Sequence, residues 1–211
     1  ANFAAALIEE FGKKALILTP DEAHAARLVT DLTAFGVKTL LFPARDFSFR
    51  AAEGQSHEYE HKRIAALYAL MKGECDCVVC PIEAALELTI PLGEFSARIR
   101  SIKTGDNYSL DDLCALLLKA GYIRSQQVDG TGQFALRGGI LDFFSPCFGM
   151  PFRIEMWGDT VDSVSVFDPQ TQRSVEKPGE AVITPAREVL CEDCGKLREL
   201  IEKLARSVKG K

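Results

Sequence analysis

Three arginines and one glutamate have the residue types and the spacing to hold a charged protein partner. Arg137 ends the run Gln133–Arg137, and Arg153 and Glu155 alternate with apolar residues in Phe152–Trp157. Alternate residues of a strand point to the same face, so we expect Arg153 and Glu155 on one polar face. Guanidinium groups bind carboxylates through parallel hydrogen bonds and are favoured at interface hot spots. The spacing therefore indicates a docking face, with an ordinary solvated sheet face as the alternative.

Arg124 lies on the segment that enters this region and could supply a third guanidinium group. In the next segment, Gln133 and Arg137 should lie opposite the apolar side chains between them. The docking hypothesis requires Arg124, Arg137 and Arg153, from separate strands, to converge on the same outward side of a single sheet.

Turn residues delimit the strands that would position these side chains. Gly138-Gly139 directly follows Arg137 and predicts a tight hairpin, because glycine adopts positive φ without steric cost. Gly158-Asp159 predicts a second hairpin, which an Asp168-Pro169 turn closes. Residues 94–180 therefore read as a mainly antiparallel α+β domain with one helix, which Ser109 would cap and which would extend to Lys119.

Residues 1–93 alternate between helical and strand patterns. Short apolar runs separated by amphipathic helices predict right-handed crossovers and a parallel sheet, hence an α/β domain. After Pro185 the chain returns to a helix, so residues 181–211 form a return segment. The expected helices span about 3–11, 20–35, 57–71, 81–88 and 193–208, and the expected strands of this part span 14–19, 37–42 and 76–80.

Motifs for catalysis or metal binding are weak. No G-x-x-x-x-G-K-[ST] phosphate loop and no G-x-S-x-G elbow occurs, so no catalytic residue is assigned. His57 and His61 lie one helical turn apart, but two histidines on a charged helix face are usually solvated. Cysteines 75, 77 and 80 flank an apolar strand and favour inert buried thiols over a zinc site, and the pair 191 and 194 lacks a second pair. We expect no metal and no cofactor in this chain.

The composition is that of an ordinary globular protein, with 47% hydrophobic and 26% charged residues among 211. A net charge of −5 argues against a chain that mainly binds phosphates, although cations in 196–211 leave weak DNA binding open. No apolar run approaches the ~20 residues that cross a bilayer, and no signal peptide is visible at Ala1. Seven cysteines, an odd count, fit reduced thiols and a cytoplasmic protein without membrane contact.

Several segments closely resemble the bacterial transcription-repair coupling factor family. They match its amino-terminal module, which is itself similar to the excision-repair protein UvrB, and the resemblance extends over essentially the whole chain. The segments that carry it are Gly121-Tyr122-x-Arg124, Gly132–Pro146, Arg153–Asp159, Asp162-Ser163 and Phe167–Ser174, with a weaker match through Arg187.

The resemblance implies a degenerate P-loop-type ATPase-like α/β domain (1–93 and 181–211) interrupted by a smaller domain (94–180) that recruits the damage sensor UvrA. It places Arg124, Arg137, Arg153 and Glu155 at positions that contact UvrA. Ala135 departs from the pattern, because UvrB-type sequences carry arginine there. The parent protein would be an ATP-driven DNA translocase that displaces stalled RNA polymerase, with ATP and magnesium in motor domains outside this chain.

A fragment of UvrB, an ATP-dependent damage-verification protein, is the alternative. UvrB has a phosphate loop and a long tyrosine-rich hairpin that probes DNA, where this chain has only residues 43–56, without tyrosine. The coupling-factor family is therefore favoured. Ala1 begins about where a helix after a phosphate loop would begin, so we interpret the chain as an excised piece, and a longer form could bind ATP.

Overall fold

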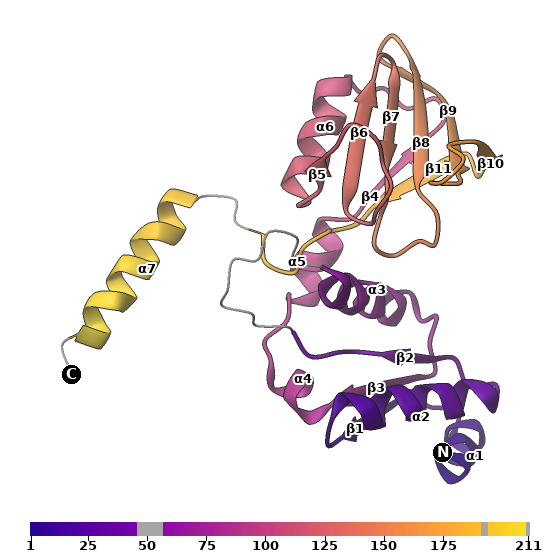
Figure 1. Cartoon of the computed structure of the whole chain (residues 1–211), viewed down its shortest axis with the longest axis vertical. Coiled ribbons are helices and arrows are strands. Elements are labelled where there is room, and N and C mark those ends of the chain that lie inside the picture. Colours follow the sequence, from indigo (N-terminus) through magenta and orange to yellow (C-terminus); the bar gives the residue numbers. More distant parts are fainter. Residues whose placement is uncertain (46–56, 191–193, 210–211) are drawn as a thin grey trace.

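The first part of the chain builds a small parallel sheet. The computed structural model describes residues 1–45, 57–190 and 194–209 and shows a mixed α/β protein with parallel and antiparallel sheets (Figure 1). The parallel sheet has the order β1-β3-β2, as the crossover pattern predicts. Its elements are α1 (Asn2–Phe11), β1 (Ala15–Thr19), α2 (Glu22–Ala34), β2 (Thr39–Leu41), α3 (Glu58–Lys72), β3 (Cys77–Pro81) and α4 (Ile82–Leu86).

Strand β3 is the centre of this sheet, and all five of its residues are buried. The edge strand β1 instead alternates, with Leu16 and Leu18 exposed while Ala15 and Ile17 pack towards α1 and α2. Helix α1 ends at Gly12, whose φ of 58° is left-handed, and the side chain of Asp21 caps α2 by accepting from the N–H of His24. Both helix boundaries are close to those predicted.

The second part of the chain forms a six-stranded sheet of order β10-β9-β8-β7-β6-β5 and a two-stranded sheet of β11 and β4. All pairings are antiparallel except that of β5 with β6. The elements are α5 (Leu92–Ala97), β4 (Arg100–Lys103), α6 (Leu110–Lys119), β5 (Ile123–Arg124), β6 (Gln133–Arg137), β7 (Ile140–Phe143), β8 (Phe152–Trp157), β9 (Thr160–Phe167), β10 (Ser174–Glu176) and β11 (Glu180–Ile183).

The predicted turns and cap of this part are confirmed. Gly138 and Gly158 both have φ of 60° and join β6 to β7 and β8 to β9. The Ser109 side chain accepts from the N–H of Asp112 at the start of α6. The core lies between α6 and one face of the large sheet, where it includes Leu113 and Leu117 of the helix.

Two features differ from the pattern expected around the middle domain. Helix α5, which Pro91 precedes, spans the expected boundary at 93/94 and was not predicted, because six residues hold too few turns to show a period. At the other end, β11 begins at Glu180 and pairs with β4 through Ile183. The division into 1–93, 94–180 and 181–211 stays a prediction.

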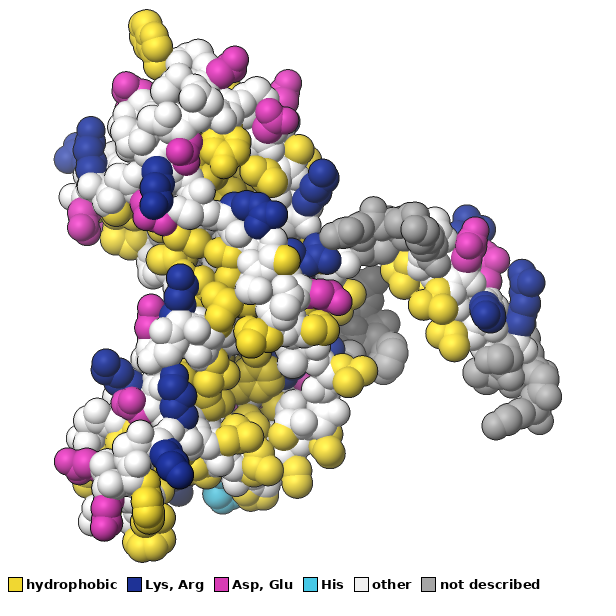
Figure 2. Space-filling model, turned by 180° about the vertical axis from the view of Figure 1, so that it is seen from behind, with side chains coloured by type: hydrophobic (Ala, Val, Ile, Leu, Met, Phe, Trp, Pro, Cys, Tyr) yellow, Lys and Arg dark blue, Asp and Glu magenta, His cyan; other side chains and the backbone are white. Residues whose placement is uncertain are grey.

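Helix α7 (Cys194–Lys209) confirms the predicted carboxy-terminal helix and stands apart from all three sheets in Figure 1. Figure 2 shows apolar side chains in a row along it and others over the half that carries the parallel sheet. The predicted loop at 43–56 lies mostly outside the described residues, as does Cys191. No helix of the described residues is long and apolar enough to cross a membrane.

Candidate partner-docking face

The strand register brings Arg137, Arg153 and Glu155 to one face of the large sheet. Asp142 of β7 lies between Ala135 of β6 and Arg153 of β8. Arg137 and Glu155 are each two residues from one of those neighbours and so point the same way. The predicted alternation is confirmed for both strands, since the core on the other face contains Phe134 and Leu136 of β6 and Phe152, Ile154 and Met156 of β8.

Asp142 is the centre of this face. Its carboxylate accepts hydrogen bonds from Arg153 Nε (2.7 Å) and Nη2 (2.9 Å) and from Arg137 Nη2 (2.7 Å). Only 1% of the Asp142 side chain is exposed. Two cations therefore share one buried anion, and Glu155 on the same face balances the remaining positive charge.

Arg153 is mostly buried, and its guanidinium group is largely used for contacts within the protein. Besides its two bonds to Asp142, its Nη1 donates to the carbonyl of Gln172 at 3.1 Å. Its guanidinium carbon lies 4.4 Å from the centre of the Phe167 ring, and only 13% of the side chain is exposed. The hydrogen bond to Asp142 raises the pKa of Arg153 above its ordinary value. Arg153 thus remains charged and fixed.

Arg137 and Glu155 are more open to a partner. Arg137 is 46% exposed, and its contacts within the described residues, to Asp142 and more distantly to Gln172 (3.5 Å), use Nη2. Glu155 is half-buried and accepts from the hydroxyl of Ser163 at 3.0 Å. The Nε and Nη1 donors of Arg137 and the carboxylate of Glu155 thus remain accessible on this face.

Arg124 corrects the expected geometry. It is exposed, but its register partner in β6 is Phe134, a core residue on the face that packs on α6. In agreement, its positive charge acts on the thiol of Cys114 in α6, where it partly offsets the rise in pKa that burial causes. The expectation that all three arginines converge on one side is wrong for Arg124. An irregular connection precedes β6, and such a connection gives no register from sequence.

Asp142 and Gln172 were missed as members of the site. Asp142 did carry a signal, since it is the only acidic residue in the run Gly139–Ser145 and a buried carboxylate requires a cationic partner. Gln172 gave no signal, because its role depends on how the turn between β9 and β10 folds back on the sheet.

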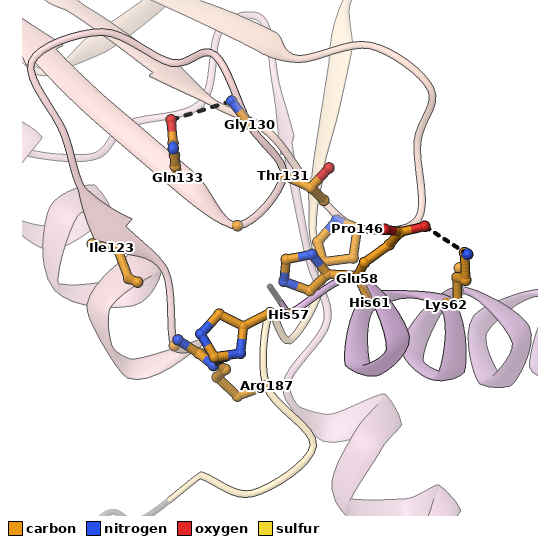
Figure 3. Close-up of a pocket in the computed structure, with 13 residues that line it drawn as sticks. His57, Glu58, His61, Lys62, Ile123, Gly130, Thr131, Gln133, Pro146 and Arg187 are labelled. Atoms are coloured by element: carbon orange, nitrogen blue, oxygen red, sulfur yellow. Dashed lines mark hydrogen bonds and ion pairs between the residues drawn. The ribbon is translucent and has the colours of Figure 1, made fainter. Parts of the chain in front are cut away.

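A cavity of about 810 Å³ lies between the start of α3 and the loops around β5 and β6 (Figure 3). His57 and His61 line it, with Arg187 beside His57. Burial lowers the pKa of His61 to about 4, and burial and the charge of Arg187 lower that of His57. The prediction of solvated histidines is therefore wrong for His61, which packs against Gly132.

A buried ion-pair network, which no sequence pattern indicated, lies beyond this cavity. Glu188 accepts from Arg63 Nε and Arg45 Nε, both at 2.8 Å, and from the hydroxyl of Thr89 at 2.9 Å. Arg63 also donates to the carbonyl of Pro43 at 2.8 Å. The segment that leaves the second part of the chain is thereby tied to α3 and to the segments after β2 and β3.

The cysteines and the basic residues of α7, which were the other candidates for a metal or DNA site, mostly make contacts within the protein. The three cysteines around β3 are buried, and burial raises each thiol pKa, that of Cys77 to about 11. Among the described residues, no group of three or more potential ligands is placed to hold a metal ion. On α7, Arg198 and Arg206 both pair with Glu202, as expected for a solvated helix surface.

Comparison with known proteins shows what this part of the chain is similar to. Residues 101–189 match the UvrB interaction domain family. The resemblance to transcription-repair coupling factors is also confirmed. The chain is 36% identical over 198 residues to that of Myxococcus xanthus and 30% identical over 190 residues to that of Bacillus subtilis. Each alignment covers 89% of this chain and 16% of the relative.

The factor of Staphylococcus aureus (strain USA300) is 30% identical over 177 residues, which cover 83% of this chain and 15% of that protein. The chain thus spans less than a fifth of the length of these relatives. Their names favour the coupling-factor family over the UvrB alternative. All four candidate docking residues, together with Asp142 and Gln172, lie within the matched segment.

Proposed function

We propose that this chain is a non-catalytic recruitment module that docks the excision-repair damage sensor UvrA. The observation that carries the proposal is the pairing of Arg137 and Arg153 on Asp142. It fixes two guanidinium groups on the polar face of the segment that matches the UvrB interaction domain family. Acidic side chains of UvrA would meet the accessible donors of Arg137, while Glu155 would take a basic group.

The surroundings of the face support this assignment. Trp157 is exposed at the end of β8, and Ile140, the register partner of both Arg137 and Glu155, is also exposed. Aromatic and apolar side chains beside arginine are the composition of interface cores. Arg124 would contribute only if the partner reaches around the β5 edge to the other face. Arg153 would act mainly by fixing Asp142.

The test is the affinity for purified UvrA. Reversal of a charge at an anchor should cost about 2–5 kcal/mol of binding, so Arg137→Glu should abolish stable capture. Arg153→Gln, which keeps two donors, should bind more weakly. Arg206→Glu is the matched control, because Arg206 is an exposed arginine of α7. Binding of UvrA by Arg137→Glu at the wild-type level would overturn the assignment.

The wider context is part of the same proposal. The parallel-sheet part would be a degenerate P-loop-type ATPase domain. The parent protein would be a cytoplasmic ATP-driven translocase that acts on DNA and displaces stalled RNA polymerase, with ATP and magnesium bound outside this chain. The competing enzymatic hypothesis is nucleotide binding by a longer form, and titration of ATP into such a form distinguishes the two.

A further inference from the structure

Gln172 has an unusual backbone conformation beside the arginine pair. Its φ is 59°, and it is the only non-glycine residue with positive φ among those the structure describes. The turn around it is well defined, since its N–H donates to the Asp168 carbonyl at 2.7 Å and the Asp168 N–H donates to the carbonyl of Arg173 at 3.0 Å. A left-handed conformation is unfavourable for a residue with a side chain, and such strain is concentrated at functional sites.

The contacts of Gln172 connect this turn to both arginines. Its carbonyl accepts from Arg153 Nη1 at 3.1 Å, and its side-chain carbonyl lies 3.5 Å from Arg137 Nη2. Its amide nitrogen donates to the carbonyls of Val128 and Pro169, at 3.3 and 2.8 Å. The side chain is thereby held between two loops with its oxygen towards Arg137.

Asp142 and Gln172 thus act on the same nitrogen of Arg137. Each offers an oxygen to Nη2, which fixes the guanidinium plane and leaves the Nε and Nη1 donors towards solvent. The Nε–H points away from Nη1, so these donors act singly, and a charge-assisted hydrogen bond from either one suits a carboxylate oxygen. A side chain ordered before binding loses less entropy on association.

We propose that Asp142 and Gln172 are positioning residues that hold Arg137 through Nη2, so that its Nε and Nη1 donors can bind a carboxylate of the docking partner. This inference rests on the proposed function, because it assigns the partner's contact group to that same face. Arg153 shares the Asp142 carboxylate with Arg137, so the guanidinium group of Arg137 can still pair with a carboxylate of the partner.

Gln172→Gly separates positioning from folding. Glycine adopts φ near 59° without strain and keeps the carbonyl that Arg153 binds, so the variant should retain the wild-type melting temperature. It removes the amide that holds Arg137, so the Kd for UvrA should rise about three- to tenfold. Gln170→Gly is the matched control, because Gln170 is exposed in the same turn. It should bind UvrA like the wild type.

Three further measurements complete the test. The NMR relaxation of the Arg137 Nε–H group should report an ordered side chain in the wild-type chain and a mobile one in Gln172→Gly. In an Arg137→Ala background, Gln172→Gly should cause no additional loss of affinity, because the group that it positions is gone. Asp142→Asn should weaken binding in the same direction, and Gln172→Gly remains decisive if that variant does not fold.

The outcomes distinguish the inference from the proposed function. If Arg137→Ala binds UvrA like the wild type, the docking face itself is wrong. If Arg137→Ala loses binding while Gln172→Gly keeps both the wild-type affinity and an ordered Arg137, only the positioning role is overturned. A fall in melting temperature that accounts for the whole loss of affinity would also overturn it, because the role would then be structural.

Discussion

Arg63 and Glu188 are 125 residues apart in the chain and form an ion pair in which neither side chain is exposed, with 2.8 Å between Nε and Oε2. Arg45 adds a second guanidinium group to the same carboxylate oxygen. A buried pair of this kind is costly to break, since the remaining charge is left without compensation.

We therefore expect Glu188→Ala to lower the free energy of unfolding by about 3–5 kcal/mol. Chemical denaturation followed by circular dichroism measures the change. Glu202→Ala is the control, because Glu202 pairs with arginines only on the surface of α7 and should change stability by at most about 1 kcal/mol. Equal effects of the two substitutions would contradict a structural role for the buried pair.

The same carboxylate predicts acid sensitivity. Burial acts to raise the pKa of Glu188, but the hydrogen bonds from Arg45 and Arg63 outweigh it, so the pKa lies below the ordinary 4.5. A lowered carboxyl pKa contributes stability that is complete above the unfolded value and is lost as the pH falls through the folded value. In Glu188→Gln the decline in melting temperature below about pH 4.5 should be shallower than in the wild type.

His61 predicts a separate pH dependence in a higher range. Its pKa of about 4 lies below the ordinary 6.5, since burial disfavours the charged ring. The unfolded chain therefore binds a proton that the folded chain resists, and stability should fall as the pH decreases from about 6.5 to about 4. His61→Gln should flatten the melting temperature across this range.

Two glycines with positive φ allow the stability cost of backbone strain to be compared with the cost of steric crowding. A Cβ at Gly138 would meet no atom within 4 Å, whereas one at Gly121 would lie 2.6 Å from Cγ of Arg187 and 2.9 Å from a methyl group of Leu190. Gly138→Ala should therefore cost about 1–2 kcal/mol from backbone conformation alone. Gly121→Ala should cost a further 1–3 kcal/mol or so from overpacking, measured by denaturant unfolding. Equal losses would mean that residues 187–190 can move away without cost.

The cap of α6 allows a simpler check. Ser109 is the residue whose side chain accepts from the Asp112 N–H, so Ser109→Ala should lower the free energy of unfolding by about 1 kcal/mol. Ser109→Asn should restore most of the loss, because its side-chain oxygen also caps a helix and its amide can donate to the Asp112 carboxylate, as the Ser109 hydroxyl does. If neither substitution changes stability, the cap contributes nothing to the fold.

Strand alternation and turns made much of the second part predictable. In Phe152–Trp157 a strict period of two assigned each side chain to its face, and the glycines at 138 and 158 fixed where hairpins close. Such patterns are local, and the register of adjacent antiparallel strands follows from a short turn. The pairing of Arg137 with Arg153 on one face was therefore accessible from sequence.

The remaining features depend on contacts between distant segments. Arg124 turned out to face α6 because its strand pairs in parallel with β6 after an irregular loop. The partners of Glu188 come from three separate segments, and Gln172 reaches the arginines only through its turn. The hydrophobic periodicity of a segment does not indicate which distant residues it contacts, because tertiary packing determines those contacts.

The ties at residues 187–188 also have a mechanical consequence. The backbone N–H of Glu188 donates to Glu60 at 2.8 Å, and Arg187 pairs with the other oxygen of the same carboxylate at 3.2 Å. Helix α5 precedes the part of the chain that contains the six-stranded sheet, and residues 187–188 follow it. This part is therefore connected to the rest of the chain at two places, which restricts its rotation. A bound partner that pulls on the sheet would transmit its load directly into α3.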